Sequence, residues 1–147
     1  MFLIAGGTCF SQTDVFRIKN FNLSEEVAIK GYDPVAYFAL NKAVKGKQDL
    51  VSSYRGIKYF FSGKTDQELF NSNPAKYEPQ YGGWCAYAMG SDGSKVEIDP
   101  STFKILDGKL FLFYNRFFNN TLKSWNADEV KLHAQADENW LKVLRQN

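Results

Sequence analysis

The stretch KLFLFY, Lys109–Tyr114, is a nearly continuous apolar run that follows an Asp107-Gly108 turn signal. A half-exposed strand alternates apolar and polar side chains, whereas an unbroken apolar run predicts a strand buried on both faces. Two shorter strand candidates precede it, Val96–Ile98 and Phe103–Leu106. The sequence therefore predicts a well-buried, central strand at 109–114, around which the remaining elements pack.

Upstream of this run, the sequence has the character of short strands separated by turns. Residues 53–61 (SYRGIKYFF) predict a hairpin. Gly56 supplies the turn, and Ile57, Tyr59 and Phe61 alternate with Lys58 and Phe60. Residues 41–53 are largely polar and predict an exposed loop or sheet edge. Residues 27–38 predict a short strand, a turn and a short apolar piece, because glycine and proline interrupt them.

Helical patterns lie between these strands and at the end of the chain. Thr65 and Glu68 have capping-box spacing, which predicts a short helix at about 66–72, and Asn73-Pro74 starts a further turn with Tyr77 facing the core. After residue 115, one helix is expected to carry Phe117, Phe118, Leu122 and Trp125. Asn126 and Glu129 predict the cap of a long final helix with an apolar stripe of Val130, Ala134, Leu141 and Leu144. We expect an α+β fold: a small antiparallel sheet with short helices and a long C-terminal helix.

The composition excludes several classes of function. The 147 residues are enough for one domain, and 16% of them are aromatic. The net charge of +2 comes without a long basic run, which argues against nucleic-acid binding. The single histidine, His133, excludes a His-rich zinc site, and Cys9 and Cys85 cannot form a CxxC motif. We find no stretch with the length and hydrophobicity of a transmembrane segment.

The N-terminal residues resemble the end of a secretory signal peptide. Residues 1–13 carry no charge, and Cys9 and Ser11 have the spacing of small residues at a cleavage site before Gln12. We therefore expect residues 1–11 to be a signal-peptide remnant, 12–26 an N-terminal extension and 27–147 a single exported, periplasmic domain. The alternative is a cytosolic N-terminus. Export would leave Cys85 as a lone thiol in an oxidising compartment.

Cys85 is the first candidate for chemistry. If 84–89 form a helical turn, the sulfurs of Cys85 and Met89 share a face, and thiolate and thioether are soft ligands that suit Cu(I). The alternatives are packing, because free cysteine and methionine are common core residues, and a reactive thiol. His133 is a candidate base for such a thiol, although nothing in the sequence places it near Cys85.

Three segments resemble the YHS domain family. They are GYDPVAYF at 31–38, the stretch from Tyr54 to Gly83, and WCAYAMG at 84–90 with IDP at 98–100 and DGKLFLFYN at 107–115. Together with the final helices the resemblance covers roughly residues 27–145, and it is to the exported, free-standing branch with a Tyr-Gly-Gly-aromatic-Cys-Ala-Tyr segment. Other branches are linked to heavy metals, but the cysteine positions of those branches correspond here to Ala36, Phe61 and Thr65.

These observations predict a small, exported, non-enzymatic YHS-like domain that binds copper through Cys85, with Met89 as second ligand. Two protein ligands make a weak site, so a homodimer with two Cys85 residues or a partner protein would complete it. The second hypothesis is a ligand- or protein-interaction module whose aromatic residues form a pocket or a partner surface, with Cys85 in the core. An exposed patch of Tyr81, Trp84 and Tyr87 would favour it. The third is a thiol enzyme that uses Cys85 and His133.

Overall fold

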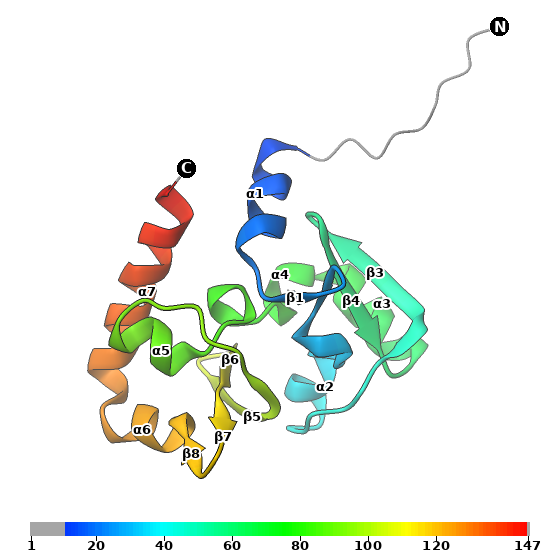
Figure 1. Ribbon diagram of the computed structural model, residues 1–147. Coiled ribbons are helices and arrows are strands. Elements are labelled where there is room, and N and C mark those ends of the chain that lie inside the picture. Colours follow the sequence, from blue (N-terminus) through cyan, green and yellow to red (C-terminus); the bar gives the residue numbers. More distant parts are fainter. Residues whose placement is uncertain (1–10, 147) are drawn as a thin grey trace, which may run out of the picture.

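Strand β6 (Lys109–Phe113) lies between two hydrophobic cores in the computed structural model, which describes residues 11–146 (Figure 1). Leu110 and Leu112 belong to one core, and Phe111 and Phe113 to the other. All four side chains are fully buried. The unbroken apolar run thus forms a strand with both faces covered, as the sequence predicts.

Short helices and strands alternate along the rest of the chain, which confirms the α+β class. The helices are α1 (Gln12–Asn20), η1 (Ile29–Gly31), α2 (Pro34–Ala39), α3 (Lys64–Ser72), α4 (Pro74–Tyr77), η2 (Gln80–Gly83), α5 (Ala86–Ser91), α6 (Thr121–Ala127) and the long α7 (Glu129–Arg145). The strands are β1 (Leu23–Ser24), β2 (Val27–Ala28), β3 (Lys47–Tyr54), β4 (Ile57–Phe61), β5 (Asp99–Leu106), β6, β7 (Asn115–Arg116) and β8 (Asn119–Asn120).

The largest sheet has the strand order β1-β2-β4-β3. The β3–β4 hairpin turns at Arg55-Gly56, as predicted, and β3 is the exposed edge. The β2–β4 pair is parallel, whereas the other pairs of the described strands are antiparallel. β5 and β6 form a separate antiparallel pair. Small, mainly antiparallel sheets are therefore present, although they do not merge into one.

The two cores lie on opposite faces of β6. The first core packs the four-stranded sheet and helices α2 to α4 against β6; its largest members are Tyr37, Tyr59, Phe61, Phe70 and Tyr77, and Cys85 belongs to it. The second core lies under α5, α6 and α7 and contains Tyr81, Ala86, Met89, Phe111, Phe113, Trp125, Leu132 and Ala136. The segment from η2 to α5 passes from one core to the other, so Cys85 and Ala86 face different cores.

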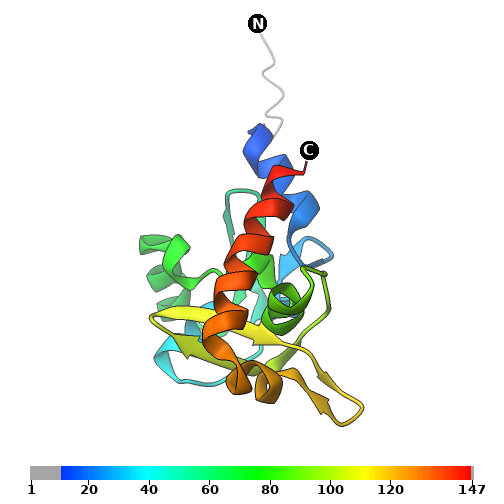
Figure 2. The ribbon, with the colours of Figure 1, turned by 90° about the vertical axis from the view of Figure 1, so that its left-hand side faces the viewer.

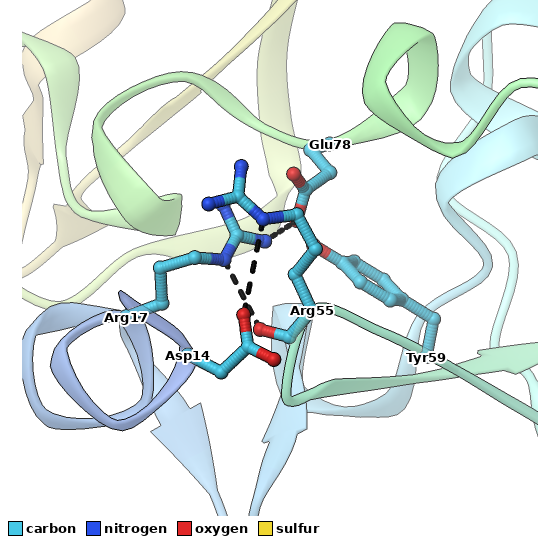
Figure 3. A network of polar contacts seen from close by, with 5 residues as sticks. All are labelled: Asp14, Arg17, Arg55, Tyr59 and Glu78. Atoms are coloured by element: carbon cyan, nitrogen blue, oxygen red, sulfur yellow. Dashed lines mark hydrogen bonds and ion pairs between the residues drawn. The ribbon is translucent and has the colours of Figure 1, made fainter. Parts of the chain in front are cut away.

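Helix α1 is tied to the sheet by a network of charges around Glu78 (Figure 3). Arg17 Nη2 lies 2.7 Å from the Glu78 carboxylate, and the Tyr59 hydroxyl donates to the same group at 2.5 Å. Burial raises the pKa of Tyr59 well above its usual range, so this hydroxyl stays a donor. Residues 12–26, predicted to form an N-terminal extension, therefore contribute α1 and β1, which pack on the rest of the fold. The predicted signal-peptide remnant and Cys9 lie outside the described residues, apart from Ser11, which caps α1.

A buried carboxylate holds α2 in place. Asp33 is fully buried and is the N-cap of α2: its Oδ1 accepts from the N–H groups of Val35 and Ala36. Its Oδ2 accepts from both the N–H and the hydroxyl of Ser62, at the end of β4. The Asp33-Pro34 pair of the GYDPVAYF stretch is therefore a helix start that also anchors the helix to the sheet.

Several helix predictions were wrong in detail. Helix α3 begins at Lys64 after Gly63, without the Thr65 capping box. The N-cap position of helix α7 is Asp128, not Asn126, and its side chain makes no capping hydrogen bond. Its buried positions are Leu132 and Ala136, whereas the predicted stripe residues Val130 and Leu141 are 87% and 49% exposed. Helix α7 has few apolar residues. Its buried face was predicted from residues such as Val130 and Leu141, which the structure exposes to solvent.

The crossing of α5 and α7 leads to a first prediction. A Cβ at Gly90 would lie 2.5 Å from the backbone oxygen of Leu132, so Gly90→Ala requires the two helices to separate. Overpacking of this kind costs about 1–3 kcal/mol, which outweighs the gain of about 1 kcal/mol from the helix propensity of alanine. We expect a lower free energy of unfolding in urea denaturation. Gly63→Ala adds the same methyl group with no atom within 4 Å and is expected to change stability by less than about 1 kcal/mol. Equal stability of Gly90→Ala and the parent would contradict the close crossing.

Candidate functional site

An open recess of about 320 Å³ lies between α5, the loop after it and the base of the β7–β8 hairpin. Its lining residues are Cys85, Tyr87, Ala88, Ser91, Asp92, Ser94, Val96, Tyr114, Asn119 and Thr121. Cys85 is 0% exposed, so the thiol lies beneath the surface of this Cys85 recess. At the rim, hydrogen bonds from the Ser94 hydroxyl and N–H hold the pKa of Asp92 below its usual range.

The Cys85 sulfur has polar partners from the segment that follows β6. The Tyr114 N–H donates to Sγ at 3.3 Å, and Thr121 Oγ1 lies 3.4 Å from Sγ. The Thr121 hydroxyl proton is engaged with the Tyr114 carbonyl at 2.7 Å, so Oγ1 is left to accept a proton from Cys85. The neutral thiol therefore satisfies both contacts, as donor to Thr121 and as acceptor from Tyr114.

Met89 lies on the other side of this segment. Cys85 precedes α5 as its N-cap residue, and the Met89 N–H donates to the Cys85 carbonyl at 3.0 Å. The Met89 side chain is fully buried in the second core, whereas Cys85 belongs to the first. The predicted helical turn exists, but its sulfur-bearing residues pack into different cores. Within residues 11–146, no group of three or more His, Cys, Asp or Glu side chains is placed to hold a metal ion.

His133 is half-buried, packs against rings of the second core and is not among the residues that line the recess. Its ring packs edge-on against Phe111, with 5.2 Å between centroids, and tilted against Trp125 at 6.0 Å. Its Nε2 lies 3.5 Å from a carboxylate oxygen of Asp137. The polar partners of His133 and Cys85 are therefore different, and the structure does not show a Cys–His pair.

Tyr81, Trp84 and Tyr87, whose exposure would have favoured the interaction module, do not form an exposed patch. Tyr81 is 3% exposed and its hydroxyl donates to Asp137, while the Trp84 indole N–H donates to the carbonyl of Asn20. Tyr87 is half-buried in the recess wall. This observation in favour of the interaction module is therefore absent at Tyr81, Trp84 and Tyr87, whose rings pack against the cores.

Among residues 11–146, the exposed aromatic side chains are those of Phe117 and Phe118, at the end of a short hairpin next to the recess. Their exposed fractions are 87% and 111%. Strands β7 and β8 pair Arg116 with Asn119, so these two phenylalanines form the whole turn, which we call the Phe117–Phe118 tip. Figure 2 shows the hairpin projecting from the body of the protein. The residues that begin the hairpin and follow it, Tyr114 and Thr121, are the polar partners of Cys85.

The backbone of the tip is strained. Phe117 and Phe118 have φ values of +52° and +62°. Left-handed geometry at both central residues is that of a type I′ turn, in which asparagine and glycine are strongly preferred. The helix predicted to carry both phenylalanines was therefore wrong, and α6 begins only at Thr121, capped by Asn120. The Asn119-Asn120 pair was the sequence signal for a break before that helix.

Burial of Cys85 leads to a second prediction. In a Cys9→Ser variant, which leaves one thiol, we expect Cys85 to react with iodoacetamide at least about 100-fold more slowly in the native protein than in denaturant, because access requires local opening. The measurement is the rate of alkylation by mass spectrometry. A native rate equal to that of the denatured chain would show that the recess is open down to the sulfur.

Comparisons with known proteins identify no relative of this chain. Neither models of protein families, nor curated proteins, nor solved structures give a match to the chain. Among the described residues, no helix combines the length and the hydrophobicity needed to cross a bilayer. Function is therefore argued from the recess, the thiol and the hairpin.

Proposed function

We propose that this protein is a non-enzymatic, YHS-like interaction module that binds its partner through the Phe117–Phe118 tip. The observation that carries the proposal is the combination of exposure and strain at the tip. Two large apolar side chains are exposed to water, and both residues have a left-handed backbone conformation that is unfavourable for phenylalanine. Strain of this kind persists where the surrounding structure enforces it, and it is concentrated at functional sites.

The conformation and exposure of the tip contribute little to the stability of the fold. A non-glycine residue in left-handed geometry costs about 1–2 kcal/mol. A phenylalanine recovers about 1.5–3 kcal/mol when it is buried, but neither ring of the tip is buried within this chain. Contact with a partner would supply that burial. The tip is therefore better explained by binding than by stability.

The position of the tip also fits an interaction surface. The hairpin rises from one wall of the Cys85 recess, so a partner seated on the tip would also cover part of the recess. The Cys85 thiol, which is hydrogen-bonded in its neutral form, then acts as a core group that fixes the base of the hairpin. This role accounts for the buried cysteine without a metal.

Replacing the tip by the residues that a type I′ turn prefers tests the proposal. We expect F117N/F118G to raise the free energy of unfolding by about 1–3 kcal/mol, because the strain is relieved and no buried contact is lost. The measurement is urea unfolding, together with retention on a hydrophobic-interaction column, which should fall.

A second variant, F117S/F118S, is the control for this experiment. It removes the rings but keeps non-glycine residues at both left-handed positions, so its stability should stay within about 0.5 kcal/mol of the parent. If F117N/F118G were instead less stable than the parent, the rings would be supporting the fold, and the proposal would be wrong.

A second candidate function is soft-metal binding, with copper as the cargo. The observation that favours it is the place of Cys85 at the Cys85 recess, where a thiol lies close to solvent. The residues present fit this role poorly, because the sulfur already has two polar partners and Met89 faces the second core. A copper site would therefore need ligands from outside the chain, such as Cys85 of a second copy in a homodimer.

Titration with Cu(I) separates the two candidates. We expect the Cys9→Ser protein to retain no more copper against a competing chelator than the same protein with Cys85→Ser, because one buried soft donor does not make a site. Copper content and oligomeric state are measured together. Stoichiometric binding that is lost with Cys85→Ser would make copper handling the working function and displace the interaction module.

A further inference from the structure

The charged residues near the Phe117–Phe118 tip indicate the chemical class of its partner. This inference rests on the proposed function. From Tyr114 to Ala127 the chain carries Arg116 and Lys123 and no acidic residue. Both cations are exposed, and neither is in an ion pair among the described residues. The other polar side chains of this segment are uncharged asparagine, threonine, serine and tyrosine. An aromatic tip with positive charge behind it is complementary to a surface that is apolar inside and negative outside.

We propose that the Phe117–Phe118 tip docks on an anionic lipid surface. In this arrangement the two rings enter the boundary between headgroups and acyl chains, and Arg116 and Lys123 lie at the level of the headgroups. The asparagines of β7 and β8 remain in the hydrated interface. The contact is shallow and peripheral.

The arrangement of the fold is compatible with such a contact. The hairpin forms one end of the molecule together with α6 and the start of α7, while the beginning of α1 and the end of α7 lie at the opposite end (Figures 1 and 2). Val130, in the first turn of α7, is 87% exposed at the hairpin end. The apolar residues exposed at this end therefore lie away from the beginning of α1 and the end of α7.

Acidic residues near the hairpin offset part of this positive charge. Asp92 lines the Cys85 recess together with Asn119 of the hairpin, and hydrogen bonds from Ser94 hold the pKa of Asp92 below its usual range. The Glu129 carboxylate is in contact with the Lys104 ammonium and accepts from the Trp125 indole N–H, so its charge is compensated. Asp128 is exposed and reduces the local positive charge by one. The net charge of the segment 114–128 remains positive, because Arg116 and Lys123 exceed Asp128. The cation of the hairpin itself is Arg116, which directly precedes the tip, and this exposed charge beside the two rings favours an anionic surface.

Vesicle flotation tests the inference. The probe is the full chain with liposomes of phosphatidylcholine alone or mixed with phosphatidylglycerol. We expect binding to the anionic vesicles that falls at least about tenfold in F117N/F118G, because two buried rings are lost. The double variant Arg116→Gln with Lys123→Gln should bind anionic vesicles more weakly, by about fivefold for each charge removed. The binding that remains should not depend on the salt concentration.

Leu40→Ser supplies the matched control. Leu40 is 62% exposed at the end of α2, outside the hairpin, and its loss should leave flotation unchanged. Equal flotation of the parent and F117N/F118G would overturn the lipid inference, as would absence of the parent from anionic vesicles. If F117N/F118G is more stable than the parent while the parent does not float, the interaction module stands and its partner is a protein. If F117N/F118G is less stable, both proposals fail.

Discussion

Burial of β6 on both faces is the constraint on which the rest of the structure depends. A strand whose four central side chains are all fully buried needs cover on each side, and the chain provides it with a sheet and short helices on one face and three helices on the other. The link from η2 to α5 must cross between these layers. Cys85 lies at that crossing, where its backbone N–H donates to the Val96 carbonyl, and this place in the fold accounts for its burial.

The hairpin is a direct continuation of the same strand. Tyr114 follows β6 without a loop, and its N–H and carbonyl bond to the Cys85 sulfur and the Thr121 hydroxyl. Two very short strands are thereby anchored at their base by a buried group. Because the base is fixed, the turn is held in its strained geometry and the rings project from a rigid support. Exposure of the tip is thus a property of the fold and does not depend on a flexible loop.

The sequence predicts those features that follow from strong, local patterns. The buried strand at 109–113, the β3–β4 hairpin and the long last helix are confirmed, because an unbroken apolar run, a glycine turn and helical length are robust signals. The placement of Cys85 and Met89 was not predictable. The helix begins at Ala86, two residues later than the predicted turn at 84–89, which leaves Cys85 outside the helix. The tip was missed for a different reason. Phe-Phe is a poor type I′ turn, and its spacing to Leu122 and Trp125 imitates a helix. Local rules fail here because the residues do not serve local stability.

The Cys85 recess and the Phe117–Phe118 tip therefore form one structural unit with an anchored base and an exposed end. Cys85 and Thr121 fix the base of the hairpin, and in the proposed function the two phenylalanines contact the partner. A contact at the tip bears on the hydrogen bonds around Cys85, since Tyr114 and Thr121 flank the hairpin on its two sides. Ring burial on binding would add apolar contact without a change in the fold, because the strained turn already has the conformation in which the rings project. Preorganisation of this kind lowers the entropic cost of association, which allows a contact of only two rings and two cations to be useful.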